Sequence, residues 1–366
     1  MRRLKPYHKH PEFIVQSEQP FNGNAPLGYL CQQFMTPTEL FFARNHGPIP
    51  LVDPDHYCLR VEGLVEKPLE LSLAAIQHDF ERIELMATLQ CAGNRRDELI
   101  DIAPIPNELP WSAGAISNAT WGGARLKDVL QAASVKTATG HAAFTSLDKV
   151  SRLGKTFGFG GSIPLDKALH PDTLLAYEMN GAPLTPAHGF PLRVIAPGYI
   201  GARSVKWLSR ITIQEQPSDN YFQARAYKLF PPDVTPENVR WDEGIMLGEN
   251  SLNSVICYPG DGDVLKAGMN RVAGYALGGA NLVERVEVSG DAGETWTTAT
   301  LMSSRAYPWA WWLWQAQVEL KPGAAQIVAR AQDSEGNAQP RDAEEIWNFK
   351  GYANNAWHRV NIQVHG

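Results

Sequence analysis

One cysteine stands in an unusual setting, within the stretch Thr88-Leu89-Gln90-Cys91-Ala92-Gly93-Asn94-Arg95-Arg96. Residues 83–89 predict a β-strand that leads into it, and small residues and two arginines follow it at once. A thiol at the end of a strand, beside fixed positive charge, should ionise easily, and a thiolate is a good ligand for a soft metal. Arginines offer planar, paired donors to an oxyanion. The stretch therefore suggests a metal-bound thiolate beside an anion pocket.

On the residues alone, three roles for Cys91 stay open. Besides a metal ligand, it can be a small buried hydrophobe, the common state of a free cysteine, or a nucleophile with a histidine partner. Arg95 and Arg96 are neighbours in a segment that we expect to be extended. Their side chains should then point in opposite directions, so at most one of them faces the metal.

The composition is that of a large folded protein whose main partner is not nucleic acid. The chain has 366 residues, 44% of them hydrophobic and 20% charged, which is enough for a large core and two domains. A formal net charge of −6 argues against binding a phosphate backbone, which needs a basic face. No stretch reaches the roughly 18 apolar residues that cross a bilayer, so we expect no membrane span.

The cysteines and the N-terminus bear on the compartment. Cys31, Cys58 and Cys257 form no C-x-x-C pair, so we expect three small buried hydrophobes rather than a zinc ribbon or a redox dithiol. The Arg2-Arg3 pair hints at export, yet no apolar stretch follows it. We therefore expect a cytoplasmic protein, or a periplasmic one if a signal was trimmed.

The order of the predicted elements favours an α+β fold. Residues 1–35 are polar and contain prolines, which predicts an extended N-terminal arm. Residues 36–240 mix strands with short helices and lack a regular βαβ alternation. Within them we predict a helix at 128–133 and strands at 83–89, 174–179, 192–195 and 205–213.

Residues 241–366 predict a domain of strands only. An irregular segment with four prolines, residues 217–250, leads into it. The predicted strands are 270–277, 282–289, 295–301, 310–320 and 325–332. Short strands separated by turns such as Lys321-Pro322-Gly323 are typical of an immunoglobulin-like sandwich.

Six segments together resemble the sulfite oxidase family of molybdenum cofactor enzymes, in particular its haem-free form in plants and bacteria. They occur in the family's order, from near residue 36 to the C-terminus, which argues against a chance match. The segments are Phe41-Phe42-Ala43-Arg44-Asn45-His46-Gly47-Pro48, the cysteine stretch, Tyr177-Glu178-Met179-Asn180-Gly181, His188-Gly189-Phe190-Pro191-Leu192-Arg193, Gly201-Ala202-Arg203-Ser204-Val205-Lys206-Trp207 and Trp357-His358-Arg359-Val360.

The resemblance implies a mixed α/β cofactor domain followed by an immunoglobulin-like domain that forms a homodimer. It also implies a molybdenum–molybdopterin cofactor, with Cys91 as the one protein ligand to the metal, and no haem. Basic side chains and backbone N–H groups suit the phosphate of such a cofactor. The residues that the resemblance assigns to the cofactor are Phe42, Ala43, Arg44, Asn45, His46, Cys91, Asp148, His188, Arg193, Ser204, Val205 and Lys206.

The resemblance places five side chains at the substrate: Arg44, Arg96, Trp111, Tyr227 and Lys350. The two arginines would bind an anion, and the phenol of Tyr227 would hold a substrate oxygen or pass a proton. Without the resemblance, the arginines are ordinary ion-pair residues and Trp111 is a core aromatic. Lys350 stands where the family has arginine; it keeps the charge but loses the planar fork, so we expect weaker anion binding.

The function implied is molybdenum-dependent oxidation of sulfite to sulfate by oxygen-atom transfer, with electrons passed to an external acceptor, either oxygen or a cytochrome. A nitrate or S-oxide reductase on the same scaffold is an alternative that Lys350 keeps open. An alternative of another class is a cofactor-free binding or scaffold protein carried by the sandwich domain.

Overall fold

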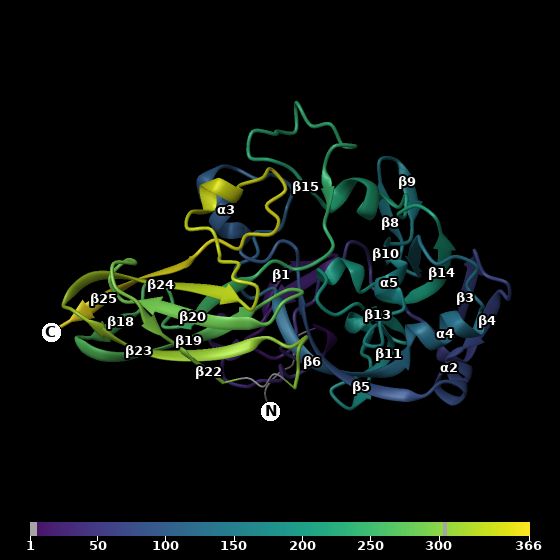
Figure 1. Ribbon diagram of the computed structural model, residues 1–366, viewed down its shortest axis with the longest axis horizontal. Coiled ribbons are helices and arrows are strands. Elements are labelled where there is room, and N and C mark those ends of the chain that lie inside the picture. The colour runs from purple at the N-terminus through teal and green to yellow at the C-terminus, as the bar shows by residue number, and fades with distance from the viewer. Residues whose placement is uncertain (1–5, 303–305) are drawn as a thin grey trace.

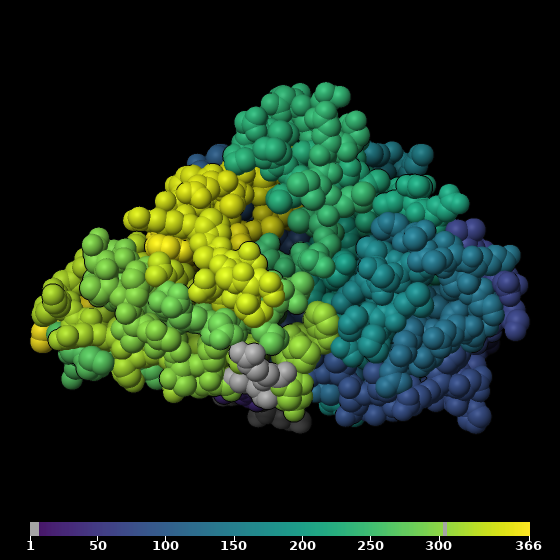
Figure 2. Space-filling model, viewed as in Figure 1, coloured from purple at the N-terminus to yellow at the C-terminus, as the bar shows by residue number. Residues whose placement is uncertain are grey.

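The computed structural model describes residues 6–302 and 306–366, and it has the predicted α+β architecture (Figure 1). A region of two sheets with short helices lies on one side of the molecule, and a β-sandwich lies on the other. Figure 2 shows the surface hollowed between the teal-green segment and the yellow segment near the C-terminus. The Arg2-Arg3 pair lies outside the described residues.

The two-sheet region is built around one apolar core that both sheets share. Its first sheet contains, in spatial order, β10 (Gly160–Pro164), β7 (His141–Ser146), β14 (Leu208–Gln214), β3 (Cys58–Gly63) and β4 (Leu69–Ser72). Neighbouring strands are antiparallel, except that β14 runs parallel to β3. The second contains β12 (Ala182–Pro183), β11 (Leu174–Met179), β6 (Ile116–Arg125) and β5 (Arg82–Gln90), with β13 (Arg193–Ile195) beside β11. The core also buries apolar residues of α2 (Leu73–Asp79), α4 (Leu126–Ala132) and α5 (Leu165–Ala168). Burial of this apolar surface stabilises the sheets that carry the site.

The sandwich packs a four-stranded sheet against a five-stranded one. The first contains β17 (Asn253–Tyr258), β19 (Gly268–Leu277), β23 (Trp312–Leu320) and β22 (Thr300–Leu301). The second contains β18 (Val264–Lys266), β25 (His358–His365), β24 (Gly323–Asp333), β20 (Val283–Ser289) and β21 (Thr297–Thr298). Buried and exposed residues alternate along much of β23 and all of β25, as expected for strands with one face on a core. Within the sandwich, sequence analysis missed β17, β18 and β25, and the strand predicted at 295–301 is two shorter ones.

Residues 6–35 do not form the extended arm that we expected. They contain a hairpin and a short helix, namely β1 (Ile14–Glu18), β2 (Phe21–Asn24) and α1 (Leu27–Leu30). The hairpin pairs with the main body through Gly23 and Ala43, and Lys9 and Asn22 are buried. The polar residues that suggested an arm are therefore used in buried hydrogen bonds, which have no periodic pattern in a sequence.

The remaining regular elements are short. Two small hairpins, β8 (Val150–Arg152) with β9 (Lys155–Phe157) and β15 (Lys228–Leu229) with β16 (Ile245–Met246), complete the strands. Cys31 and Cys257 are buried as predicted, but Cys58 is exposed, so the prediction was wrong for Cys58, which lies at the solvent-facing start of β3. Within residues 6–302 and 306–366, no helix is long and apolar enough to cross a membrane.

The cysteine stretch forms the turn between β5 and α3 (Arg96–Ile102). The strand predicted at 83–89 is confirmed, but the two arginines do not lie in an extended segment. Arg95 has φ 65° and ψ 31°, in the left-handed region, and α3 begins at the next residue. Because Arg95 is left-handed and α3 begins at Arg96, the two side chains bind different parts of the molecule.

Arg95 joins this turn to the sandwich. Its guanidinium is fully buried and donates to both carboxylate oxygens of Glu98 at 2.7 Å. It also donates to Asn253 Oδ1 at 2.8 Å and to the carbonyl oxygen of Ala356 at 2.7 Å. Two residues of the sandwich region thus share one buried cation with the cysteine turn.

Replacing Arg95 should therefore destabilise the fold strongly. We expect Arg95→Met to lower the free energy of unfolding by about 3–5 kcal/mol, because Glu98, Asn253 and the carbonyl oxygen of Ala356 all lose a fully buried, charged donor. Arg82→Met is the matched control: it breaks exposed ion pairs with Glu84 and Glu178 and should cost about 1 kcal/mol or less. Urea unfolding of the two variants measures the difference, and equal losses would contradict the role given to Arg95.

Candidate cofactor and anion site

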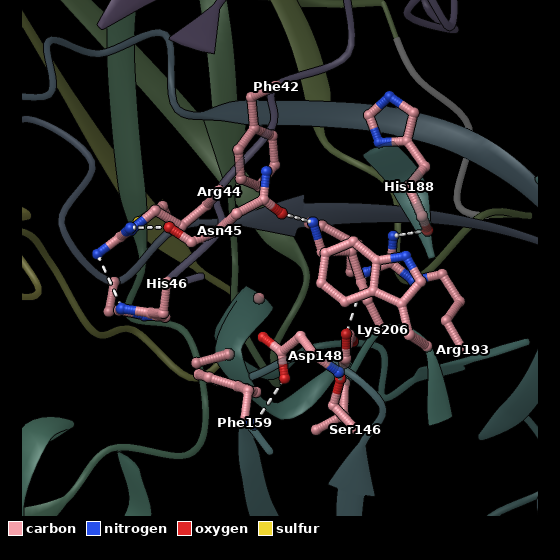
Figure 3. A pocket seen from close by; sticks show the side chains of 18 of the residues that line it. Phe42, Arg44, Asn45, His46, Ser146, Asp148, Phe159, His188, Arg193 and Lys206 are labelled. Carbon is pink, nitrogen blue, oxygen red and sulfur yellow. Dashed lines mark hydrogen bonds between the residues drawn. The ribbon is translucent and has the colours of Figure 1, made fainter. Parts of the chain in front are cut away.

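The predicted cofactor residues converge on one pocket. Figure 3 shows Arg44, Asn45 and His46 on one side of it and His188, Arg193 and Lys206 on the other. The predicted residues that line it are Phe42, Arg44, Asn45, His46, Cys91, Asp148, His188, Arg193, Ser204, Val205, Lys206 and Tyr227. Ala43 is buried next to this lining, where its backbone pairs with Gly23.

Cys91 lies at the wall of the pocket, directly after β5. Its side chain is nearly buried, and Sγ accepts a hydrogen bond from the backbone N–H of Gly93 at 3.4 Å. Its own N–H donates to the carbonyl oxygen of Ala115 at 2.9 Å, which fixes the turn. In the described part of the chain, no group of three or more His, Cys, Asp or Glu side chains could hold a metal ion. A metal bound at Cys91 would therefore need most of its ligands from a cofactor.

The pocket buries an excess of positive charge. Burial lowers the pKa of Arg193 to about 9. Burial, together with the charge of Arg193, lowers the pKa of Lys206 well below its usual value. Burial also lowers the pKa of His188 far below the ordinary histidine value. The carboxyl group that lines the pocket, Asp148, accepts a hydrogen bond from the N–H of Phe159 at 2.7 Å, and burial raises its pKa. Such a cluster is stabilised when an anion binds it.

The donors of this cluster fit a phosphate-bearing pterin. Arg193 donates to the carbonyl oxygens of His188 at 2.9 Å and Ser204 at 3.1 Å. Its Nε–H is buried and has no hydrogen-bond partner among the described residues. A buried donor without a partner is costly, so it favours a ligand that supplies an acceptor. Lys206 adds a charged donor on the same side, held by Ala187 O at 2.9 Å and by Asn45 Oδ1.

On the other side of the pocket, His46 links Arg44 to Tyr227. Arg44 Nη2 lies 3.3 Å from His46 Nδ1, and His46 Nε2 lies 2.8 Å from the hydroxyl of Tyr227. A guanidinium can only donate, so Nδ1 accepts and the ring proton is on Nε2. The oxygen of Tyr227 then accepts from His46, which leaves its phenolic hydrogen available to the pocket.

Both groups of this link are neutral near pH 7. Burial, followed by the charge of Arg44, lowers the pKa of His46 well below its usual value. Burial also raises the pKa of the Tyr227 phenol. Tyr227 follows a single π-helical turn, residues Phe222–Ala226, which brings its ring to the pocket. This side of the site thus supplies a neutral hydrogen-bond donor next to a fixed charge.

Arg96 lies beside the pocket without lining it. Its guanidinium is buried against Gly93, where an added Cβ would meet Nη2 at 2.3 Å, so only glycine leaves room for it. It donates to the carbonyl oxygens of Leu109 at 2.8 Å and Gly351 at 3.1 Å. The guanidinium also lies 5.1 Å from the centre of the Tyr352 ring. That ring stacks on Tyr227 at 5.3 Å, so Arg96 is joined to the pocket through two aromatic rings.

Trp111 and Lys350 also lie outside the pocket lining. Trp111 is fully buried in the cluster that contains Cys91, and its indole N–H has no partner among the described residues. Lys350 is paired with the carboxylate of Glu108, and Arg96 Nη2 lies 3.8 Å from the same carboxylate. The charge of Lys350 is therefore balanced inside the protein.

Sequence reasoning missed three residues of this neighbourhood: Lys9, Glu108 and Tyr352. Lys9 contacts His188, and Glu108 contacts Lys350. These pairs are 179 and 242 residues apart in the chain. No local pattern marks such pairs, and Tyr352 follows the Lys350 segment without a motif of its own.

Comparisons with known proteins agree with this geometry. Residues 46–222 match the oxidoreductase molybdopterin binding domain, and residues 245–365 match the Mo-co oxidoreductase dimerisation domain. The chain is 44% identical to sulfite oxidase of Gallus gallus, over 96% of this chain and 78% of that protein. The chain belongs to the sulfite oxidase family.

A second relative supports the family, and a solved structure supports the fold. It is 38% identical to sulfite oxidase of Arabidopsis thaliana, over 97% of this chain and 95% of that protein. The crystal structure of the sulfane dehydrogenase SoxCD from Paracoccus pantotrophus has the same fold, with a TM-score of 0.78 and 24% sequence identity, covering 98% of this chain and 90% of that one. The expected α+β fold and the family are thereby confirmed.

The buried lysines predict how stability without cofactor depends on pH. Burial lowers the pKa of Lys9 to about 7 and that of Lys206 well below 10.5 in the folded state. The unfolded state therefore binds more protons than the folded state across this window, and stability rises with pH. We expect the melting temperature of cofactor-free protein to rise from about pH 7 to about pH 9.5. The rise should be smaller in Lys206→Met, and identical profiles would contradict this account.

Proposed function

We propose that this protein oxidises sulfite to sulfate with a molybdenum–molybdopterin cofactor held in the pocket described above. The observation that carries the proposal is a buried excess of cations around Cys91, in a chain of the sulfite oxidase family. Cys91 would bind the metal, and Arg193, Ser204 and Lys206 would bind the phosphate and pterin. When bound, the cofactor supplies oxygen-atom transfer and takes up two electrons. Overall, sulfite and water give sulfate, two protons and two electrons.

The residues of the chain bind and orient the anion. Arg44, which lines the pocket, offers the fixed positive charge. Tyr227 donates its phenolic hydrogen to an oxygen of sulfite, because His46 already donates to the phenolic oxygen. Arg96 acts from behind Gly93, where it raises the positive potential without direct exposure to the pocket.

A reductase acting on nitrate or an S-oxide is the second candidate. The observation that favours it is the pairing of Lys350 with Glu108. The carboxylate lowers the net positive charge that Arg44, Arg96 and Lys350 would otherwise give the substrate region. A cofactor-free scaffold protein is disfavoured, since the unpartnered Nε–H of Arg193 and the buried cations would cost stability without a ligand.

We further propose that residues 241–366 form a homodimer interface, as the match of residues 245–365 to a dimerisation domain supports. The electrons would leave one at a time to an external acceptor. Oxygen and a cytochrome both stay open as acceptors, and the cytoplasmic location stays a prediction.

Sulfite-dependent reduction of ferricyanide tests the function. We expect turnover in protein of known molybdenum content and none in Cys91→Ala. Arg44→Ala should lower kcat/KM for sulfite by about 10²-fold, because Arg44 is the charged donor that lines the pocket, whereas Arg96→Ala should have a smaller effect. Full molybdenum loading without sulfite turnover would overturn the proposal in favour of the reductase.

Glu108 gives a sharper test of the substrate region. Glu108→Gln should free the charge of Lys350 and lower the KM for sulfite by about fivefold, with kcat little changed, because one more positive charge then acts on the anion. Glu70→Gln, which breaks an exposed pair with Arg60, is the control and should leave KM unchanged. Steady-state kinetics at low ionic strength decide it; an unchanged KM in Glu108→Gln would show that this carboxylate does not limit anion binding.

A further inference from the structure

Lys9 lies outside the residues that match the molybdopterin binding domain, 46–222, and contacts two residues that line the cofactor pocket, Phe41 and His188. Its side chain is almost completely buried, at 1% exposure. Nζ lies 2.7 Å from His188 Nε2, 2.7 Å from the carbonyl oxygen of Phe41 and 2.9 Å from that of Thr38. Lysine has three donors, and here all three have partners.

The burial of this ammonium needs an explanation. Among the described residues, no carboxylate lies within 4 Å of Nζ, so Lys9 has no ion pair there. Lysine is rarely buried without one, because desolvation opposes the charged form. Burial indeed lowers its pKa to about 7, although Glu39 acts in the opposite direction. Packing alone would be better served by an apolar residue.

The partners of Lys9 belong to two separate walls of the pocket. Phe41 itself lines the pocket, in the same segment as Phe42 and Arg44. His188 is on the opposite wall, where Arg193 holds its carbonyl oxygen at 2.9 Å. The rings of Phe41 and His188 meet edge-to-face at 5.3 Å. Lys9 thus connects the backbone at Phe41 to the ring of His188. These contacts fix the orientation of that ring and the spacing of the two walls.

We propose that Lys9 is a positioning residue of the cofactor site: by fixing the imidazole of His188 it makes retention of the anionic pterin depend on the N-terminal segment. The inference rests on the proposed function, because it takes the pocket to hold that cofactor. In this arrangement Lys9 also adds positive potential behind His188 without touching the ligand. Residues 6–35 then complete the site as well as the fold.

The test compares variants purified from a host that makes the cofactor. Pterin, measured as its fluorescent oxidised derivative, and molybdenum are determined per folded polypeptide after size-exclusion chromatography. Lys9→Met has nearly the same length and apolar stem but no donors, and it should lose pterin and molybdenum several-fold. Lys9→Arg, which keeps charge and donors, should restore most of both.

Leu30→Ala is the matched control for packing. Leu30 is buried in the same N-terminal segment, against the sandwich and away from His188. This variant should melt at a lower temperature yet keep the parent's pterin content. If Lys9→Met yields no folded protein, Lys9→Gln replaces it, and an intermediate loss is expected because the amide keeps donors but no charge.

The outcomes distinguish failure of the proposed role of Lys9 from failure of the proposed function. Full pterin and molybdenum in the folded Lys9 variants, with loss in His188→Ala, would overturn the role of Lys9 and leave the proposed function standing. Equal pterin loss in Leu30→Ala and Lys9→Met would also overturn it, since general loosening of the segment would explain both. Parent protein that carries no pterin or molybdenum would instead overturn the proposed function.

Discussion

The buried guanidinium of Arg95 is the contact on which the site depends. It closes the turn after Cys91 through Glu98, and it reaches Asn253 and Ala356 in the sandwich region. Because the cation is fully buried, its partners must be present together and in place. The position of the thiol is therefore set jointly by a strand of one region and by the packing of the other.

The pocket that this turn borders is organised by charge that the protein does not neutralise. Arg193 is buried and Lys206 half-buried near His188, and Lys9 contacts His188 from behind the pocket lining. Removing these basic groups from water lowers the stability of the cofactor-free protein, and binding of an anionic cofactor offsets that loss. The same arrangement explains why the empty protein should be sensitive to pH and why the N-terminal segment is packed rather than free.

On the substrate side, the neutral side chains of His46 and Tyr227 are held in place by hydrogen bonds that begin at the charged Arg44. His46 is oriented by Arg44, and it orients Tyr227 in turn. Glu108 contacts both Lys350 and Arg96, so one carboxylate offsets part of the charge of two cations. The net charge of this region therefore depends on a carboxylate as well as on the basic residues.

The sequence alone indicated the family through motifs of contiguous residues, and the α+β architecture through strand periodicity and turns, because these depend on local patterns. Most of the pocket lining was expected only through the resemblance to that family. The tertiary structure decided what the patterns could not contain. Arg95 and Arg96 diverge because Arg95 is left-handed, which an assumption of extended backbone missed. Lys9 meets His188, Glu108 meets Lys350 and Tyr352 stacks on Tyr227 across more than a hundred residues each. Such contacts arise only when separate segments are packed together, since a buried charge or ring finds its partners in space and not along the chain.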